Sequence, residues 1–216
     1  MGITVAPFSH EHFQSLPPLN AAVENYHNLD GPKLVQGVFK EFFVKHGMEY
    51  TFGLALPHRH FDLKPGTRLV SYNGVSTPWP TEPGIGMQEP SPSNWSFSAD
   101  GKLFPTEFRY AKGHTFHMGE REEAFVAEFK AELDRLGLGQ LFGLCEYPGN
   151  DFEGSFEITR GNSNINLEPK DYPEDASGSE AAWFYSAEVL TSECKCLCHN
   201  REASHNHNGQ HYQVQQ

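Results

Sequence analysis

Phe39-Lys40, Gly47 and Phe52-Gly53-Leu54 recur later in the chain as Phe129-Lys130, Gly137 and Phe142-Gly143-Leu144. The second set follows the first at a constant offset with no gap. In both sets the matching positions fall on the apolar face of a helix, on the glycine after it and on the start of a strand. Self-similarity at a fixed offset is typical of a duplicated unit, although Gly after a helix and Phe in a strand are also common by coincidence.

The first copy begins at Asp30-Gly31-Pro32, where proline suits the first position of a helix. Apolar residues then follow at three- and four-residue spacing up to Gly47, which predicts an amphipathic helix. Strands are predicted over 48–56 and 67–72, and Asn73-Gly74 is typical of a tight turn. Because 75–101 is crowded with Pro, Gly and Ser, we expect a long loop there.

The second copy has the same order of elements. A strand over 103–111 leads to a helix over about 120–136, ended by Gly137, and strands over 140–147, 152–159 and 164–167 follow. The sequence therefore predicts one α+β domain over 1–190, with internal duplication of a helix-strand-strand unit at about 32–74 and 120–167. We expect a largely antiparallel sheet with amphipathic helices on one face.

The composition excludes several kinds of partner. The 216 residues include 28 acidic and 16 basic side chains, which gives a formal net charge of -12. Without a basic cluster, nucleic acid and anionic membranes are not expected partners. Neither a secretory signal nor a long apolar run is present, so a cytoplasmic or nucleocytoplasmic location is expected. No phosphate loop and no nucleotide or flavin fingerprint occurs.

His58-Arg59-His60-Phe61-Asp62 directly follows the first strand. Because alternate side chains of an extended chain share a face, His58, His60 and Asp62 form a candidate metal or catalytic site. A histidine oriented by Asp62 would also serve as a general acid or base without metal. The remaining alternative is a pair of exposed loop histidines.

His114 and His117 precede the second helix and are weaker candidates for a site shared with His58 and His60. Their alternative role is structural, because a histidine here would also cap the helix or fill a polar gap.

The last segment is rich in thiols and imidazoles. Ser177 and Glu180 form a capping-box pattern, which predicts a short apolar helix within 181–190. Residues 191–216 are expected to be a flexible tail that binds Zn(II) or Cu(I), with Cys194, Cys196, Cys198 and His199 as ligands. His205, His207 and His211 follow. Adventitious metal binding by a disordered tail and a redox role for the thiols are the alternatives.

The blocks Leu56-Pro57-His58-Arg59-His60-Phe61-Asp62 and Thr77-Pro78-Trp79, together with Cys194 to His199, resemble those of a group of uncharacterised filamentous-fungal proteins. The resemblance covers most of the chain and implies a fungal origin and a link to specialised metabolism. It implies no activity and assigns no role to any residue.

Three functional hypotheses follow. The first is a cytosolic metal-binding protein, with metal at the tail and a second site at His58, His60 and Asp62, where a small molecule would be the further partner. The second is a small metal-independent enzyme, such as a cyclase, isomerase or hydrolase, with His58 or His60 as the general acid or base. The third is a non-catalytic interaction module, in which these histidines are exposed.

Overall fold

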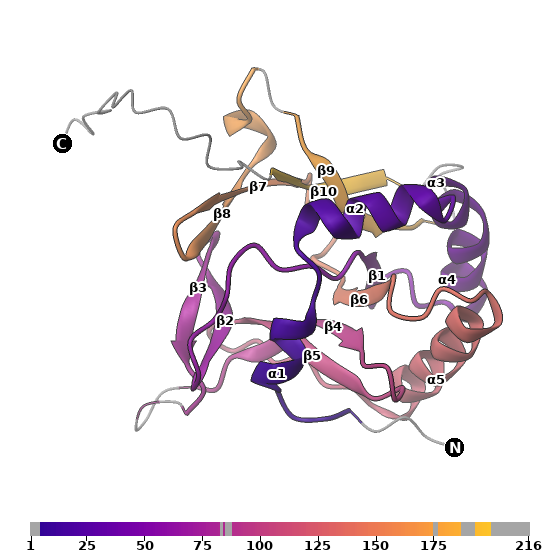
Figure 1. Cartoon of the computed structure of the whole chain (residues 1–216), viewed down its shortest axis with the longest axis horizontal. Helices are drawn as coiled ribbons and strands as arrows, with labels where there is room; N and C mark the ends of the chain where they lie inside the picture. Colours follow the sequence, from indigo (N-terminus) through magenta and orange to yellow (C-terminus); the bar gives the residue numbers. More distant parts are fainter. Residues whose placement is uncertain (1–4, 83, 85–87, 175–176, 187–192, 200–216) are drawn as a thin grey trace.

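A computed structural model describes residues 5–82, 84, 88–174, 177–186 and 193–199, with only the backbone at 193–195. Within these residues, ten strands close into a mixed barrel in the order β1-β6-β4-β5-β2-β3-β8-β7-β10-β9. Figure 1 shows α3, α4 and α5 at the right of this barrel, with α2 running across the top towards them and α1 lying apart from them at the bottom, near β5. None of the helices in the described residues is long and apolar enough to cross a lipid bilayer.

The strands are β1 (Phe52–Ala55), β2 (Thr67–Tyr72), β3 (Val75–Pro80), β4 (Ser91–Phe97), β5 (Leu103–Arg109), β6 (Gly143–Glu146), β7 (Ser155–Arg160), β8 (Ser163–Leu167), β9 (Ser179–Phe184) and β10 (Glu193–His199). The helices are α1 (His10–Ser15), α2 (Leu19–Asn28), α3 (Gly31–Leu34), the π-helical η1 (Val35–Phe39), α4 (Lys40–His46), α5 (Glu120–Arg135) and the 3-10 turn η2 (Pro169–Asp171).

The predicted sheet with helices on one face is wrong, because the sheet closes on itself. Four strands come from segments that were expected to hold no strand. β3 and β4 occupy the predicted loop, β9 replaces the predicted apolar helix, and β10 lies in the predicted tail. Residues 187–190 of that helix lie outside the described residues.

Pro78 and Pro80 do not prevent β3 from forming, because they occupy positions that need no ladder donor. Tyr72 and Val75 pair across the two-residue turn. The backbone nitrogens of Ser76, Pro78 and Pro80 therefore point away from β2, and of these only Ser76 carries an N–H. On that side β8 pairs only with Val75 and Ser76. Pro78 and Pro80 therefore lie where β3 pairs with no further strand among the residues that the structure describes.

The strand β9 was not predicted because both of its faces are buried. Trp183 packs with the helices, whereas Ala182 belongs to a second cluster with Ala55 and Cys145. The segment therefore shows no polar alternation, and a short run that is apolar on both faces does not distinguish a strand from a buried helix.

Both long amphipathic helices and their ends are confirmed. Residues 31–46 are helical throughout, as α3, η1 and α4, and Gly47 ends them with φ +63°, while Gly137 follows α5 with φ +67°. Met48 N donates to Phe43 O at 3.1 Å, and Leu138 N donates to Leu133 O at 2.9 Å. The repeated glycines thus form the same left-handed helix end, which a residue without Cβ adopts without strain.

The strand order is symmetric. If each of β1 to β5 is exchanged with the strand five numbers later, so that β1 takes the place of β6 and β2 that of β7, the same ring of strands is obtained in the opposite direction. Every pair of neighbours is kept, and the parallel pair β2–β5 becomes the parallel pair β7–β10. The repeated residues Leu54 and Leu144 pair with each other where β1 crosses β6. The halves are interlocked, because in the described part of the chain the neighbours of β1 are β6 and β9 and those of β6 are β1 and β4.

The main core lies outside the barrel, between its wall and the helices. Phe39 of η1 and Phe129 of α5 meet there at 5.7 Å between ring centroids, over Phe52, Trp95 and Trp183 of the strands. The large apolar side chains of β1 and β6, and Trp183 of β9, therefore point outward to the helices, whereas Phe184 of β9 lies on the cavity side. Much of the remaining inner wall consists of small side chains.

A cavity of about 260 Å³ fills the interior. Every strand contributes to its wall, in chain order through Ala55, Ser71, Ser76, Asn94, Glu107, Cys145, Glu157, Asn166, Ala182 and Cys198. A barrel of about eight strands is just filled by its own side chains, so ten strands with small inward residues leave room for a ligand.

Candidate metal centre

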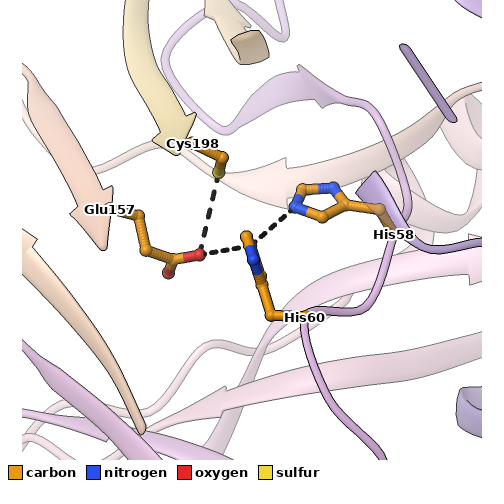
Figure 2. A group of neighbouring side chains, drawn as sticks. All are labelled: His58, His60, Glu157 and Cys198. Atoms are coloured by element: carbon orange, nitrogen blue, oxygen red, sulfur yellow. Dashed lines mark hydrogen bonds and ion pairs between the residues drawn. The ribbon is translucent and has the colours of Figure 1, made fainter. Parts of the chain in front are cut away.

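Four side chains from different segments point toward one another, as Figure 2 shows. They are His58, His60, Glu157 and Cys198, and each offers one ligand atom within 4.8 Å of the others. His58, Glu157 and Cys198 also line the cavity. These residues form a group that could hold a metal ion.

The loop after β1 presents both histidines on one side. Between them, Arg59 points the other way and is fixed to the N-terminal segment, where its backbone N donates to Pro17 O and its Nε to Leu16 O, both at 2.9 Å. Leu56 N donates to Ala181 O of β9 at 2.8 Å. Because the loop is held at Leu56 and at Arg59, the positions of His58 and His60 are defined by backbone contacts.

Glu157 and Cys198 are brought together by strand pairing. β7 and β10 run parallel, and their register places Cys198 beside Glu157, with Sγ 3.7 Å from Oε1. The group thus joins segments from the start and the end of the chain.

His58 is held in its neutral form. Its Nδ1 donates to Leu56 O at 2.7 Å, so its Nε2 carries a lone pair directed at His60. Burial, with a smaller effect from His60, lowers the pKa of His58 to about 4. A hydrogen bond from the second ring nitrogen to a backbone carbonyl is the usual way in which proteins orient a metal-binding histidine.

His60 Nε2 lies between two acceptors. It is 2.9 Å from His58 Nε2 and 2.7 Å from Glu157 Oε1, and the His60 side chain is only 3% exposed. With the His58 lone pair directed at it, this nitrogen has one proton to share between an imidazole and a carboxylate. The second nitrogen, Nδ1, is buried and has no hydrogen-bond partner among the described residues. A metal cation placed between the four side chains could be bound by both histidine nitrogens, the Glu157 oxygen and the Cys198 sulfur together.

The carboxylates and the thiol near this point titrate abnormally. Burial opposes ionisation of Glu157, but the hydrogen bond and charge of His60 outweigh it and hold the pKa of Glu157 below its usual value. Burial, reinforced by Glu157, raises the pKa of Glu107 across the cavity to about 7. Burial and the charge of Glu157 raise the pKa of the Cys198 thiol well above its usual value.

The ligand atoms lie near the spacing around a tetrahedral ion, with two of the pairs closer, at hydrogen-bond distance. The neighbouring ligand atoms are separated by 2.7, 2.9 and 3.7 Å. Bonds of about 2.1 Å to a tetrahedral ion place ligand atoms roughly 3.4 Å apart, so small side-chain movements would complete the coordination.

Asp62 does not join His58 and His60. Its side chain is 70% exposed and forms an ion pair with Arg59 on the outer side of the loop. His114 also lies elsewhere, where its Nε2 is 2.6 Å from Glu146 Oε1, and His117 is exposed. In the structure, Glu157 rather than Asp62 supplies the carboxylate beside His58 and His60, and neither His114 nor His117 belongs to the group.

The predicted Cys/His set of the tail is divided between the two faces of β10. Cys198 faces the cavity, and so does Cys196, which accepts a hydrogen bond from Ser155 Oγ at 3.4 Å. His199 stacks on Phe156 and its Nδ1 donates to Ser177 O at 2.7 Å. The side chain of Cys194, together with His205, His207 and His211, lies outside what the structure describes.

Glu157 and Glu107 were missed from the sequence. Each is a carboxylate inside a predicted strand, and Glu157 stands between Phe156 and Ile158. In an open sheet with helices on one face, a carboxylate within a strand is expected to face solvent on the other face. It indicates a buried polar site only when both faces of the strand are known to be covered.

Comparison with protein-family models, with curated proteins and with solved structures finds no match to this chain.

Proposed function

We propose that this protein binds one divalent transition-metal ion, Zn(II) in preference, through His58 Nε2, His60 Nε2, a Glu157 oxygen and Cys198 Sγ. The observation that carries the proposal is the position of His60 Nε2 between the His58 lone pair and the Glu157 carboxylate. Two acceptors around one buried nitrogen are poorly satisfied by a proton, and well satisfied by an ion with tetrahedral coordination.

The donor set favours zinc over the alternatives. Zinc accepts imidazole, thiolate and carboxylate together, whereas Cu(I) prefers sets dominated by soft sulfur ligands. Two histidines and one carboxylate also suit Fe(II), but the addition of Cys198 as a fourth donor shifts the preference to zinc.

The test is metal binding by matched variants. Equilibrium dialysis of the full chain against Zn(II) is expected to give one tightly bound ion. His60→Gln should weaken binding by on the order of 100-fold or more, because ligand loss exceeds the effect of losing an outer partner. His117→Gln is the matched control, since His117 is exposed. Equal Zn(II) affinity in the two variants would reject the proposal.

A second candidate function is metal-free acid–base catalysis. It is supported by the 2.7 Å contact between His60 and Glu157 beside a cavity that also contains Glu107. A carboxylate that orients an imidazole is a common general-base arrangement. The absence of stoichiometric metal, combined with saturable binding of small molecules in the cavity, would favour this function over zinc binding.

A further inference from the structure

The cavity and the metal group share a wall. His58, Glu157 and Cys198 line the cavity of about 260 Å³, so an ion bound to them would face the space inside the barrel. Structural zinc sites are closed by protein on all sides, whereas catalytic sites leave one direction open. With four protein ligands the ion would have no vacant tetrahedral position, so a further ligand would approach from the barrel interior and raise its coordination to five.

The interior is lined by small and polar residues. Ser76, Ser93 and Thr106 line the cavity although each is less than a tenth exposed. Glu146 is also buried, and its Oε2, which lies 3.5 Å from Arg109 Nη1, has no hydrogen-bond partner among the described residues. Buried polar groups normally have partners, so this wall is suited to a polar occupant.

The size of the cavity limits its occupant. A cavity of about 150 Å³ accommodates benzene, and typical drug-sized ligands need about 300 Å³ or more. The interior of this barrel therefore suits a molecule of roughly ten non-hydrogen atoms.

A hollow next to the cavity is lined mainly by acidic side chains. This second hollow, of about 600 Å³, shares Gly74, Phe152, Ser155 and Asn166 with the first. Its charged lining consists of Asp151, Glu153, Glu168, Lys170 and Asp171. Carboxylates lining a cleft repel anions and concentrate cations.

We infer that the interior of the barrel is a ligand chamber in which a small polar molecule, neutral or positively charged, coordinates the metal ion directly. This inference rests on the proposed metal site. The molecule enters through the acidic hollow, contacts the serines and threonine of the wall, and becomes an additional ligand of an ion that extends its coordination from four to five. Phosphorylated and carboxylated molecules are disfavoured on this path.

The test uses the full chain loaded with Co(II), whose visible spectrum reports coordination. At mildly alkaline pH, imidazole serves as the neutral probe and azide as the anionic probe. Imidazole is expected to change the spectrum in a saturable way, and azide to bind at least about tenfold more weakly because of the acidic hollow.

Two variants and one matched control separate the chamber from the metal site. Ser76→Leu adds bulk inside the cavity and should weaken imidazole binding by about tenfold or more, with unchanged Co(II) affinity. Thr77→Leu is its matched control, because Thr77 points to the other face of β3, where its Oγ1 accepts from Trp79 Nε1 at 3.0 Å. Glu153→Lys lies at an exposed position and should strengthen azide binding without altering folding.

The outcomes are distinguishable. One Co(II) per chain with a spectrum that imidazole leaves unchanged would overturn the chamber and leave the proposed metal site standing. No Co(II) binding would overturn both. Azide binding as tight as that of imidazole, unaffected by Glu153→Lys, would overturn the assigned charge preference of the ligand.

Discussion

Cys198 determines how many protons leave when metal binds. Its raised pKa keeps the thiol protonated at neutral pH, whereas a metal ligand must be a thiolate. We expect Zn(II) binding to release about one proton more from the wild-type chain than from Cys198→Ser. Calorimetric titration in buffers of different ionisation enthalpy measures this difference. Equal proton release would show that Cys198 is not a ligand.

Glu107 makes the stability of the metal-free protein depend on pH. Burial, with the charge of Glu157, raises its pKa from 4.5 to about 7, so between these values the unfolded chain loses a proton that the folded chain keeps. Stability should therefore fall as the pH rises through this window, by on the order of 3 kcal/mol.

Glu107→Gln should remove this loss. Urea unfolding with a chelator present, at about pH 5 and about pH 8, gives the difference between the two chains at each pH. The lowered pKa of His58 makes the folded protein less stable as the pH falls, which is opposite to the effect of Glu107. Because wild type and Glu107→Gln both contain His58, its contribution cancels when the two are compared. Parallel profiles for wild type and variant would contradict the assignment.

At this scale the sequence revealed only part of the site. His58 and His60 could be found because two residues apart in extended chain they share a face. Asp62 has the same spacing, but the chain bends before it and Arg59 binds it on the outside. Glu157 and Cys198 come from strands distant in sequence, and their proximity depends on a register that no local pattern contains.

At the level of secondary-structure elements, Gly47 and Gly137 end the two long helices in the same left-handed conformation. Substitution of Gly137 tests how much that conformation requires glycine. Gly137 has φ +67°, and no atom lies within 4 Å of the position that a Cβ would take, so Gly137→Ala would add only backbone strain. We expect a loss of about 1 kcal/mol in the free energy of unfolding. Chemical denaturation measures it.

Gly37→Ala is the matched control. Gly37 lies inside the helical segment η1, also with no atom within 4 Å, and alanine is favoured in a helix. We expect this substitution to stabilise the protein by up to about 1 kcal/mol. Equal effects of the two substitutions would show that the left-handed backbone at Gly137 costs alanine nothing.

The helices were more predictable than the strands for a physical reason. Each long helix carries its apolar periodicity and its terminal glycine in adjacent residues, so local sequence specifies it. β9 and β10 have no such local pattern, because Ala182 and Trp183 are buried on opposite faces and Cys196 and Cys198 face a cavity. Their strand conformation depends on neighbours that pair with them from elsewhere in the chain.

The whole barrel depends on the segment that was expected to be a flexible tail. A chain ending at residue 190 would leave β7 and β9 each with an unpaired edge and would lack Cys198. We expect this chain to aggregate or to lose its cooperative thermal transition. Size-exclusion chromatography and calorimetry provide the measurements.

A chain ending at His199 is the control for this truncation, because it keeps β10 and all four ligands. We expect it to bind one Zn(II) and to unfold cooperatively. If the metal were held by the histidines beyond residue 199, this chain would bind none.

The interlocked strands also have a consequence for synthesis. β1 leaves the ribosome before either of its neighbours exists, because β6 and β9 both follow α5 in the chain. Phe52 and Leu54 therefore remain without their strand partners until β6 has been made, and Leu54 without its second partner until β9 has been made. Closure of such distant pairs is slow, and in the interval the nascent protein presents an apolar strand that chaperones recognise.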